Sequence, residues 1–135
     1  MPDLKSAAMM LRMARKDLSA LNGMLSEQTF PEEIFGFHAQ QAVEKALKCW
    51  LCVLTDEAPR THDLEQLFGL VEEAGARVPA EFPGLMDLTD FAVIFRYGEI
   101  ELDAGIDRPS VLKQVVRLIE HTEGVLREAE EDGTV

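Results

Sequence analysis

The 135-residue sequence has few of the residues that hold small folds together through covalent bonds or metal ions. With only two cysteines and three histidines, it indicates neither a disulfide framework nor a zinc site. No apolar run approaches the roughly 20 residues of a membrane-spanning helix. The first residues also lack the apolar stretch of a secretory signal. We therefore expect a cytoplasmic protein that makes no membrane contact and needs no cofactor or metal.

Positive charge is also scarce. Thirteen lysines and arginines stand against 25 aspartates and glutamates, which gives a net charge of -12. The excess lies in residues 61–135, whereas residues 1–60 are about neutral. Because an acidic surface repels phosphate backbones, broad nucleic-acid binding is not expected. The cations that could still form a local basic patch are Arg12, Arg15, Lys16, Lys45 and Lys48.

Helical periodicity is what the sequence has in abundance. Apolar residues make up 47% of it and recur in steps of three and four, whereas no stretch alternates as a strand would. This pattern predicts an all-α, antiparallel up-and-down bundle that forms a single domain over residues 1–135. We expect five helices near residues 3–25, 31–54, 62–75, 83–97 and 108–131.

Capping residues mark the starts of several predicted helices. Thr29 is expected to cap the second helix, with Glu32 completing a capping box. Thr61 and Asp63 are both able to start the third helix, and Pro109 is expected at the start of the fifth. In the first helix, methionines widen the apolar face beyond what one core needs. We therefore expect a homodimer, since a two-fold pair is the commonest closed arrangement.

Polar side chains of the second predicted helix have helical spacing too. Steps of three, four and three residues put His38, Gln41, Lys45 and Lys48 along one line, called here the polar stripe. Glu44 and Lys48 form a favourable i,i+4 pair. One interpretation is a solvent-facing stripe stabilised by this ion pair. The other is a cradle for an anionic or nucleobase ligand, in which Gln41 donates and accepts hydrogen bonds.

Cys49 and Cys52 form a C-x-x-C motif deep inside the second predicted helix. A redox pair of this kind needs a helix N-terminus, and zinc needs further ligands at suitable spacing. We therefore predict two buried structural cysteines. The acidic stretch 99–103 departs from a calcium-binding loop in its glycine and in its twelfth position, so we interpret it as a solvated loop.

Two further motifs lie at the ends of predicted helices and keep two interpretations each. His62 precedes Asp63 at a helix start, where a capping turn and a ligand contact are both open. Arg96, followed by Tyr97, borders the apolar face of the fourth predicted helix. An arginine there must meet a carboxylate, a carbonyl or a ligand. A structural ion pair and a direct ligand contact therefore both remain open.

The order of three segments resembles the HEPN domain family of small helical proteins. Residues 37–48 (FHAQQAVEKALK) resemble its second-helix signature, residues 61–64 (THDL) its next landmark, and Arg96-Tyr97-Gly98 its Arg-Tyr-Pro. The resemblance covers nearly the whole chain. It implies an up-and-down helical bundle that commonly dimerises. It also implies a neighbouring minimal nucleotidyltransferase, the two acting as a toxin–antitoxin pair or as a nucleotide-handling unit.

The same resemblance bears on catalysis. Ribonuclease members of the family carry a histidine four to six residues after an arginine, whereas Arg96 is followed by YGEIELD. The missing acid–base group and the negative net charge argue against a ribonuclease. We therefore expect a non-catalytic module that binds a nucleotide-like ligand, a nucleotidyltransferase, or both. The alternatives are a ribonuclease toxin with an atypical histidine such as His62, and a purely structural dimerising helper.

If there is a functional surface, we expect it where the polar stripe meets the end of the fourth predicted helix. No residue is assigned a catalytic role. Because the lysines are taken to be exposed, their removal is expected to weaken an anionic ligand at little cost in stability. The predicted ligand-binding residues are Gln41, Lys45, Lys48, His62, Arg96 and Tyr97.

Overall fold

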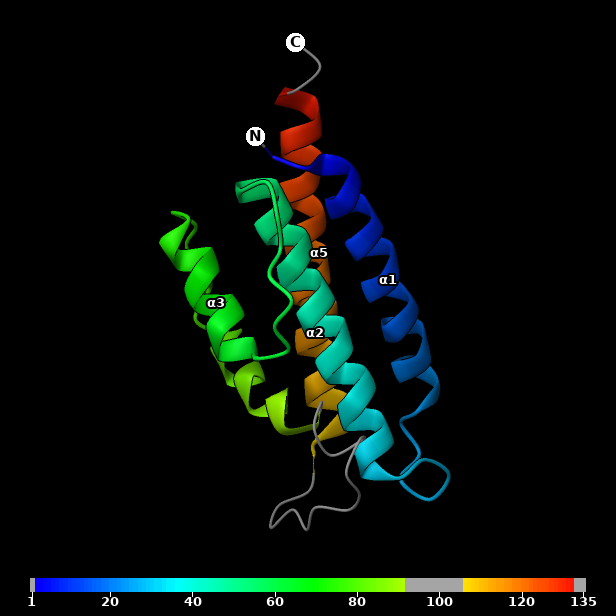
Figure 1. Ribbon diagram of the computed structural model, residues 1–135. Coiled ribbons are helices and arrows are strands. Elements are labelled where there is room, and N and C mark those ends of the chain that lie inside the picture. The colour runs from blue at the N-terminus through cyan, green and yellow to red at the C-terminus, as the bar shows by residue number, and fades with distance from the viewer. Residues whose placement is uncertain (1, 92–105, 133–135) are drawn as a thin grey trace.

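A computed structural model describes residues 2–91 and 106–132 of the chain. In this part the chain forms four α-helices and one 3₁₀ helix, with no strand (Figure 1). The prediction of an all-α fold is confirmed, and the predicted ends of the four α-helices are correct to within two residues. The elements are α1 (Leu4–Gly23), α2 (Glu32–Leu54), α3 (Leu64–Glu73), η1 (Pro83–Thr89) and α5 (Arg108–Asp132).

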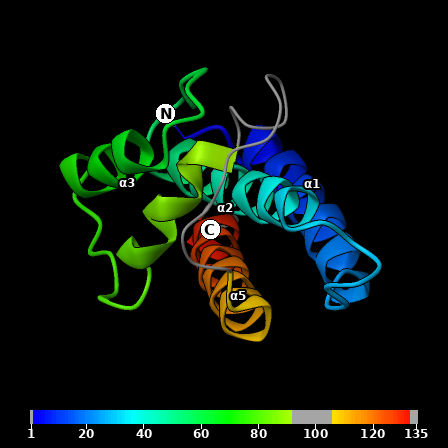
Figure 2. The same cartoon turned by 90° about the horizontal axis from the view of Figure 1, so that it is seen from below.

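Helix α2 is the central element of the fold. It contacts α1, α3, η1 and α5, and the end-on view shows it in the middle of them (Figure 2). Fifteen of its 23 residues are buried, against six of the 25 in α5. A helix that is covered on nearly every side must satisfy its polar groups within the protein, because water cannot reach them. The polar residues of α2 are therefore constrained by packing.

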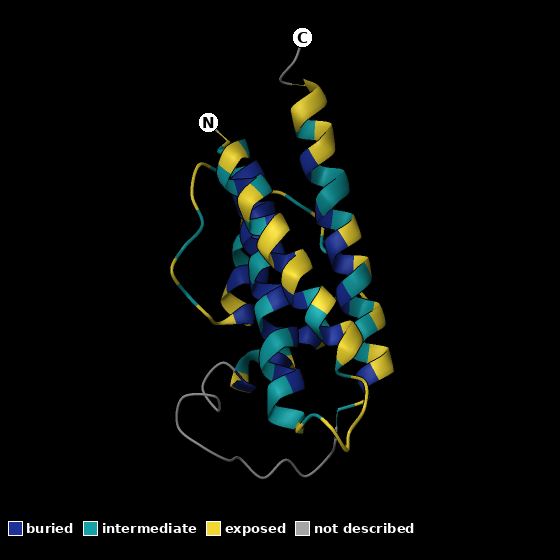
Figure 3. Cartoon of the chain, turned by 90° about the vertical axis from the view of Figure 1, so that its right-hand side faces the viewer, coloured by how far each residue is buried: buried dark blue, intermediate teal, exposed yellow. Residues whose placement is uncertain are grey.

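Small residues let α1 and α2 lie close together. Ala7 and Ala14 in α1 and Ala39, Ala42 and Ala46 in α2 are completely buried. These side chains occupy helical steps of three, four and seven, so each set lies on one face of its helix. Larger apolar residues of α2, α3 and α5 continue the same hydrophobic cluster. Buried segments, drawn dark blue in Figure 3, recur along the helices that face the viewer there.

A buried arginine holds the loop between α1 and α2. Arg108 is 3% exposed, and its Nη1 donates to the carbonyls of Met24 at 2.9 Å and Ser26 at 3.1 Å. Its Nη2 donates to the carbonyl of Phe30 at 2.8 Å. The guanidinium carbon lies 5.3 Å from the centre of the Phe35 ring. The first residue of α5 therefore fixes a loop that is distant in sequence.

The start of α2 differs from the prediction. Pro31 occupies the cap position, and no side chain caps the helix there. Thr29 belongs to a turn instead and accepts a hydrogen bond from the hydroxyl of Ser26 at 3.2 Å. Glu32 makes no capping box, because its carboxylate accepts the backbone N–H of Ile106. The expected Thr29 cap is wrong, since tertiary contacts from the segment before α5 determine this end.

The fourth predicted helix, residues 83–97, begins as a 3₁₀ helix over Pro83–Thr89. Proline lacks a backbone donor and glycine is a poor helix former, so Pro83-Gly84 weakens an α-helical start. Residues 92–105 lie outside the described residues, and the predicted helix end and the predicted acidic loop at 99–103 fall there. The two predicted site residues Arg96 and Tyr97 belong to this segment.

Both cysteines are buried, as predicted. Cys49 is 0% and Cys52 3% exposed, and neither forms a disulfide. Burial raises the pKa of the Cys49 thiol to about 12 and also raises that of Cys52, so both are protonated at neutral pH. The described residues contain no group of three or more side chains arranged to hold a metal ion. No helix in this part is long and apolar enough to cross a membrane.

One glycine of α2 is required by packing. A Cβ atom at Gly36 would overlap ring atoms of Phe91, which is 4% exposed. We expect Gly36→Ala to lower the free energy of unfolding by about 2 kcal/mol, because overpacking outweighs the gain in helix propensity. The matched control is Gly69→Ala in α3, where a Cβ meets no atom within 4 Å. This control should raise the free energy of unfolding by about 0.5–1 kcal/mol, because alanine is the better helix former. Urea unfolding followed by circular dichroism measures both, and equal stabilisation would contradict the packing.

Candidate functional site

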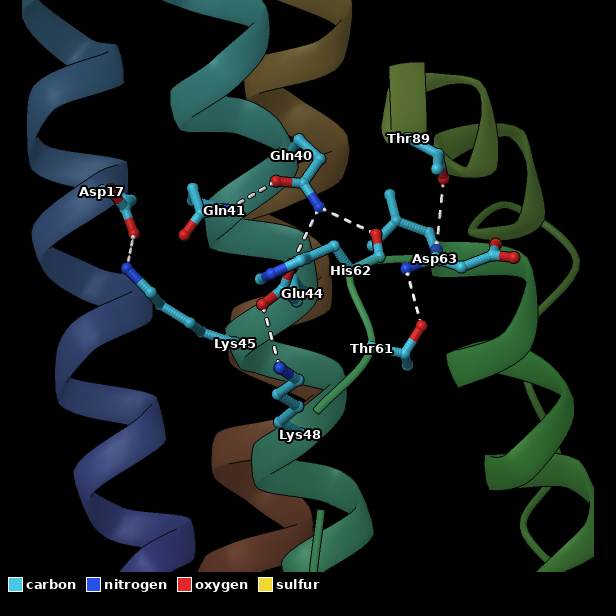
Figure 4. A network of polar contacts seen from close by, with 11 residues as sticks. Asp17, Gln40, Gln41, Glu44, Lys45, Lys48, Thr61, His62, Asp63 and Thr89 are labelled. Carbon is cyan, nitrogen blue, oxygen red and sulfur yellow. Dashed lines mark hydrogen bonds and ion pairs between the residues drawn. The ribbon is translucent and has the colours of Figure 1, made fainter. Parts of the chain in front are cut away.

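Beside the polar stripe of α2 lies a buried carboxylate, Glu44, which is 4% exposed. Gln40 Nε2 donates to Glu44 Oε1 at 2.9 Å, and Lys48 Nζ donates to Glu44 Oε2 at 3.0 Å. His62 Nδ1, from the segment before α3, lies 2.8 Å from Oε1 (Figure 4). Both carboxylate oxygens therefore have partners, and one partner comes from outside the helix.

These partners determine the charge of Glu44. Burial is the largest single effect, and it would raise the pKa of the carboxyl group. Hydrogen bonds from Gln40, His62 and Lys48 oppose burial and together hold the pKa below its ordinary value of 4.5. Glu44 is therefore ionised at neutral pH and neutralises the buried Lys48.

Gln40 connects this carboxylate to the rest of the network. It is completely buried, and its Nε2 also donates to the backbone carbonyl of His62 at 3.1 Å. Its Oε1 accepts a hydrogen bond from Gln41 Nε2 at 2.7 Å. Gln41 is half-buried, so part of its amide is used inside the protein.

A second carboxylate links α1 to α2. Asp17 is 9% exposed, although it lies on a helix that faces solvent on its other side. Its Oδ2 accepts a hydrogen bond from Lys45 Nζ at 2.7 Å, and its Oδ1 lies 3.1 Å from His38 Nδ1. Two residues of the polar stripe, Lys45 and His38, therefore contact α1 rather than solvent alone.

The network ends at the start of α3. Asp63 Oδ1 accepts the backbone N–H of Glu65 at 3.0 Å, which confirms Asp63 as the start of this helix. Thr61 Oγ1 accepts the backbone N–H of Asp63 at 3.1 Å. From η1, Thr89 Oγ1 accepts the backbone N–H of Leu64 at 3.1 Å. The His62 segment is thus held by both its own turn and η1.

The structure brings three predicted site residues into the network around Glu44: Gln41, Lys48 and His62. Lys45 belongs to a separate cluster with Asp17 and His38. The role of these predicted site residues in ligand binding stays a prediction. The expectation of exposed lysines is wrong, because Lys48 is buried and the Lys45 side chain is only 19% exposed. Each ammonium group reaches a carboxylate, and the stems of both side chains are covered by protein.

Two polar residues with important contacts, Asp17 and Gln40, were not predicted from the sequence. Asp17 lies within the apolar seam of α1, three residues after the buried Ala14 and four before the buried Leu21. A carboxylate at such a position indicates a buried ion pair, and this signal was available. Gln40 lies one helical turn before Glu44, and this i,i+4 spacing of two polar residues could also have indicated their contact.

His121 packs against two aromatic rings, a contact that the sequence did not indicate. Its ring centre lies 4.7 Å from that of Trp50 and 5.9 Å from that of Phe82. These distances are typical of packed aromatic pairs. His121 therefore joins α5 to α2 and to the residue before η1 through aromatic contact.

A family model described as HEPN domain matches residues 7–132, which is nearly the whole chain. The chain belongs to the HEPN domain family. Comparisons with curated proteins and with solved structures found no match. Membership supports, in general terms, a nucleotide-binding or ribonuclease-like module.

An acidic cleft lies at the start of α3 in this HEPN domain. It has a volume of about 390 Å³, and Asp63, the residue after His62, is among the residues that line it. Four carboxylates line it, and they would repel a phosphate group. The lining residues are Asp63, Glu65, Met86, Asp87, Thr89 and Asp90.

Replacing Glu44 tests the network. Glu44→Gln is expected to lower the free energy of unfolding by about 3 kcal/mol at pH 7, because Lys48 would remain buried without its counter-charge. The native pKa of Glu44 lies below its ordinary 4.5. The stabilisation by the carboxylate is therefore complete above about pH 4.5 and is lost as the pH falls through the native pKa.

The measurement is urea unfolding of wild type and Glu44→Gln between pH 7 and pH 3. Their difference should shrink below about pH 4.5. Glu72→Gln, at an exposed position of α3, is the control and should change stability by less than about 0.5 kcal/mol. A difference that is small at pH 7, or that does not change with pH, would contradict a stabilising buried carboxylate.

Proposed function

We propose that this HEPN domain is a non-catalytic binding module whose main role is to bind a protein partner. Family resemblance suggests a minimal nucleotidyltransferase as the partner, in a toxin–antitoxin-like pair. The polar stripe then serves as an internal clasp that holds α1, α2 and the start of α3 together. A homodimer is a further part of this proposal, and binding of a nucleotide-like ligand at the polar stripe is an alternative to it.

One observation carries the proposal. Both lysines of the polar stripe already bind carboxylates of the same chain, Lys45 with Asp17 and Lys48 with Glu44. An anionic ligand would have to displace a carboxylate and leave it partly buried without a counter-charge, which is unfavourable. The four carboxylates of the neighbouring cleft add repulsion. This arrangement supports a scaffold for surface contacts better than a phosphate cradle.

A ribonuclease that uses His62 is the second candidate, and one observation favours it. The His62 side chain is 51% exposed, and its Nδ1 lies against the ionised Glu44. A carboxylate at Nδ1 orients an imidazole and leaves Nε2 for acid–base chemistry, as in catalytic dyads. The acidic cleft beside His62 argues against RNA binding there.

The ribonuclease candidate has a direct test. Purified protein, free of any partner, is expected not to cleave total RNA above background, because repulsion opposes RNA near His62. Denaturing gels of the RNA after incubation provide the measurement. If cleavage is seen, His62→Asn is compared, since asparagine can still donate to Glu44 but cannot act as an acid or base. Loss of cleavage in that variant, with unchanged circular dichroism, would favour the ribonuclease over the proposal.

The nucleotide-binding alternative is tested by calorimetric titration with AMP and ATP at low salt. We expect no heat beyond dilution, because Lys45 already holds Asp17. Lys45→Gln is the test variant, and Lys113→Gln, at an exposed position of α5, is its control. A charge-assisted hydrogen bond contributes about 1.5–3 kcal/mol, or tenfold or more in affinity. Binding that weakens by this factor in Lys45→Gln alone would show that the polar stripe is a ligand site after all.

A further inference from the structure

Helix α1 presents a basic, methionine-bearing surface to solvent. Its members, called here the α1 stripe, are spaced by four, three, one and three residues and so share one side of the helix. All are exposed, and exposed segments recur along α1 in Figure 3. The α1 stripe consists of Lys5, Met9, Arg12, Met13 and Lys16.

Exposed apolar bulk is concentrated at this helix. Met9 is 43% and Met13 is 37% exposed, and Leu25, just after α1, is 43% exposed. In the part of the chain that the structure describes, these three are the exposed large hydrophobic residues. Methionine side chains are flexible and polarizable, and they adapt well to apolar surfaces of partners. The two methionines therefore provide an apolar contact area that the core of this chain does not use.

The charge of this surface is opposite to that of the molecule. Helix α1 carries four of the 13 basic residues of the chain, and its one acidic residue, Asp17, is buried against Lys45 and His38. Arg15 pairs with Glu123 of α5. No ion pair within the described ranges involves Lys5, Arg12 or Lys16. The outward side of α1 is therefore positive in a protein with a net charge of -12.

We propose that the α1 stripe docks an acidic amphipathic helix of a different protein. Carboxylates of that helix would pair with Lys5, Arg12 and Lys16, and its apolar side would cover the two methionines. From Lys5 to Lys16 the stripe extends about 16 Å, since each residue rises 1.5 Å, so a helix of about three turns matches it. The proposal rests on the partner-binding function above and gives that function its surface.

Charge favours this occupant over a second copy of the chain. A two-fold axis through the α1 stripe would place the same patch against itself, and the three unpaired cations would face one another. Like charges at such an interface are unfavourable. A nucleic acid would meet the cations but would gain little from Met9 and Met13. Its extended backbone would also be repelled by the acidic remainder of the molecule.

The test uses a labelled 14-residue helical peptide with leucines on one face and glutamates elsewhere, and a matched peptide with lysines in place of the glutamates. Fluorescence anisotropy measures their binding to the full chain at low and high salt. We expect the glutamate peptide alone to bind, and more weakly at high salt. Arg12→Glu/Lys16→Glu should weaken it by about tenfold or more. Met9→Ser/Met13→Ser should weaken it by a smaller factor, because apolar contact is lost.

Arg60→Glu/Arg77→Glu is the control, since it reverses two exposed charges outside α1 and should leave binding unchanged. Each variant changes exposed residues, and circular dichroism checks that its fold is retained. Equal binding of both peptides, no binding, or equal losses in the control and in Arg12→Glu/Lys16→Glu would overturn the proposal.

Two other results would assign the α1 stripe to a different occupant and also overturn the proposal. One is a dimer in sedimentation that Arg12→Glu/Lys16→Glu dissociates. The other is a single-stranded RNA oligonucleotide that displaces the glutamate peptide and binds through the same two residues. RNA cleavage, by contrast, decides the non-catalytic function independently, so failure of the docking surface and failure of the proposed function can be told apart.

Discussion

The buried carboxylate of Glu44 governs how the helices are arranged around α2. A charge in a helix that is covered by α1, α3, η1 and α5 is tolerated only if its oxygens have partners. Gln40 and Lys48 come from the same helix, but His62 comes from the segment before α3. Compensation of the charge therefore also determines where α3 begins. A shift of that segment would leave a buried polar atom unpaired, so the network favours one arrangement.

The cations of α2 act between helices rather than toward solvent. Lys45 crosses to Asp17 of α1, and Lys48 neutralises the carboxylate that holds the start of α3. In an acidic protein, two lysines one turn apart suggest a phosphate site when they are considered without their surroundings. Packing gives them a different use, because burial makes an intramolecular carboxylate the nearest counter-charge. Lys5, Arg12 and Lys16 on the outward side of α1 form no ion pair in the described ranges, so this helix is the better candidate for a binding surface.

Periodicity was sufficient to predict the α-helices, because their apolar seams and the Asp63 start are local features of the sequence. The predicted cap at Thr29 was wrong, because a contact from the segment before α5 determines that end. The predicted α-helix was wrong at Pro83–Thr89, where the Pro83-Gly84 pair weakens the α-helical start. The site was harder to predict. Spacing placed Lys45 and Lys48 on one line, but it could not show that Asp17, 28 residues before Lys45, would meet it. Such partners depend on helix packing, which no local pattern encodes.

Arg108 has a consequence for the order in which the chain can acquire its structure. The carbonyls that it binds lie 78 to 84 residues earlier in the sequence. During synthesis, α1 and α2 emerge long before α5, so their connecting loop lacks this arginine while the hairpin forms. Closing such a long segment is entropically unfavourable until other contacts have brought α5 near. The α1–α2 connection is therefore completed late, when the last helix arrives.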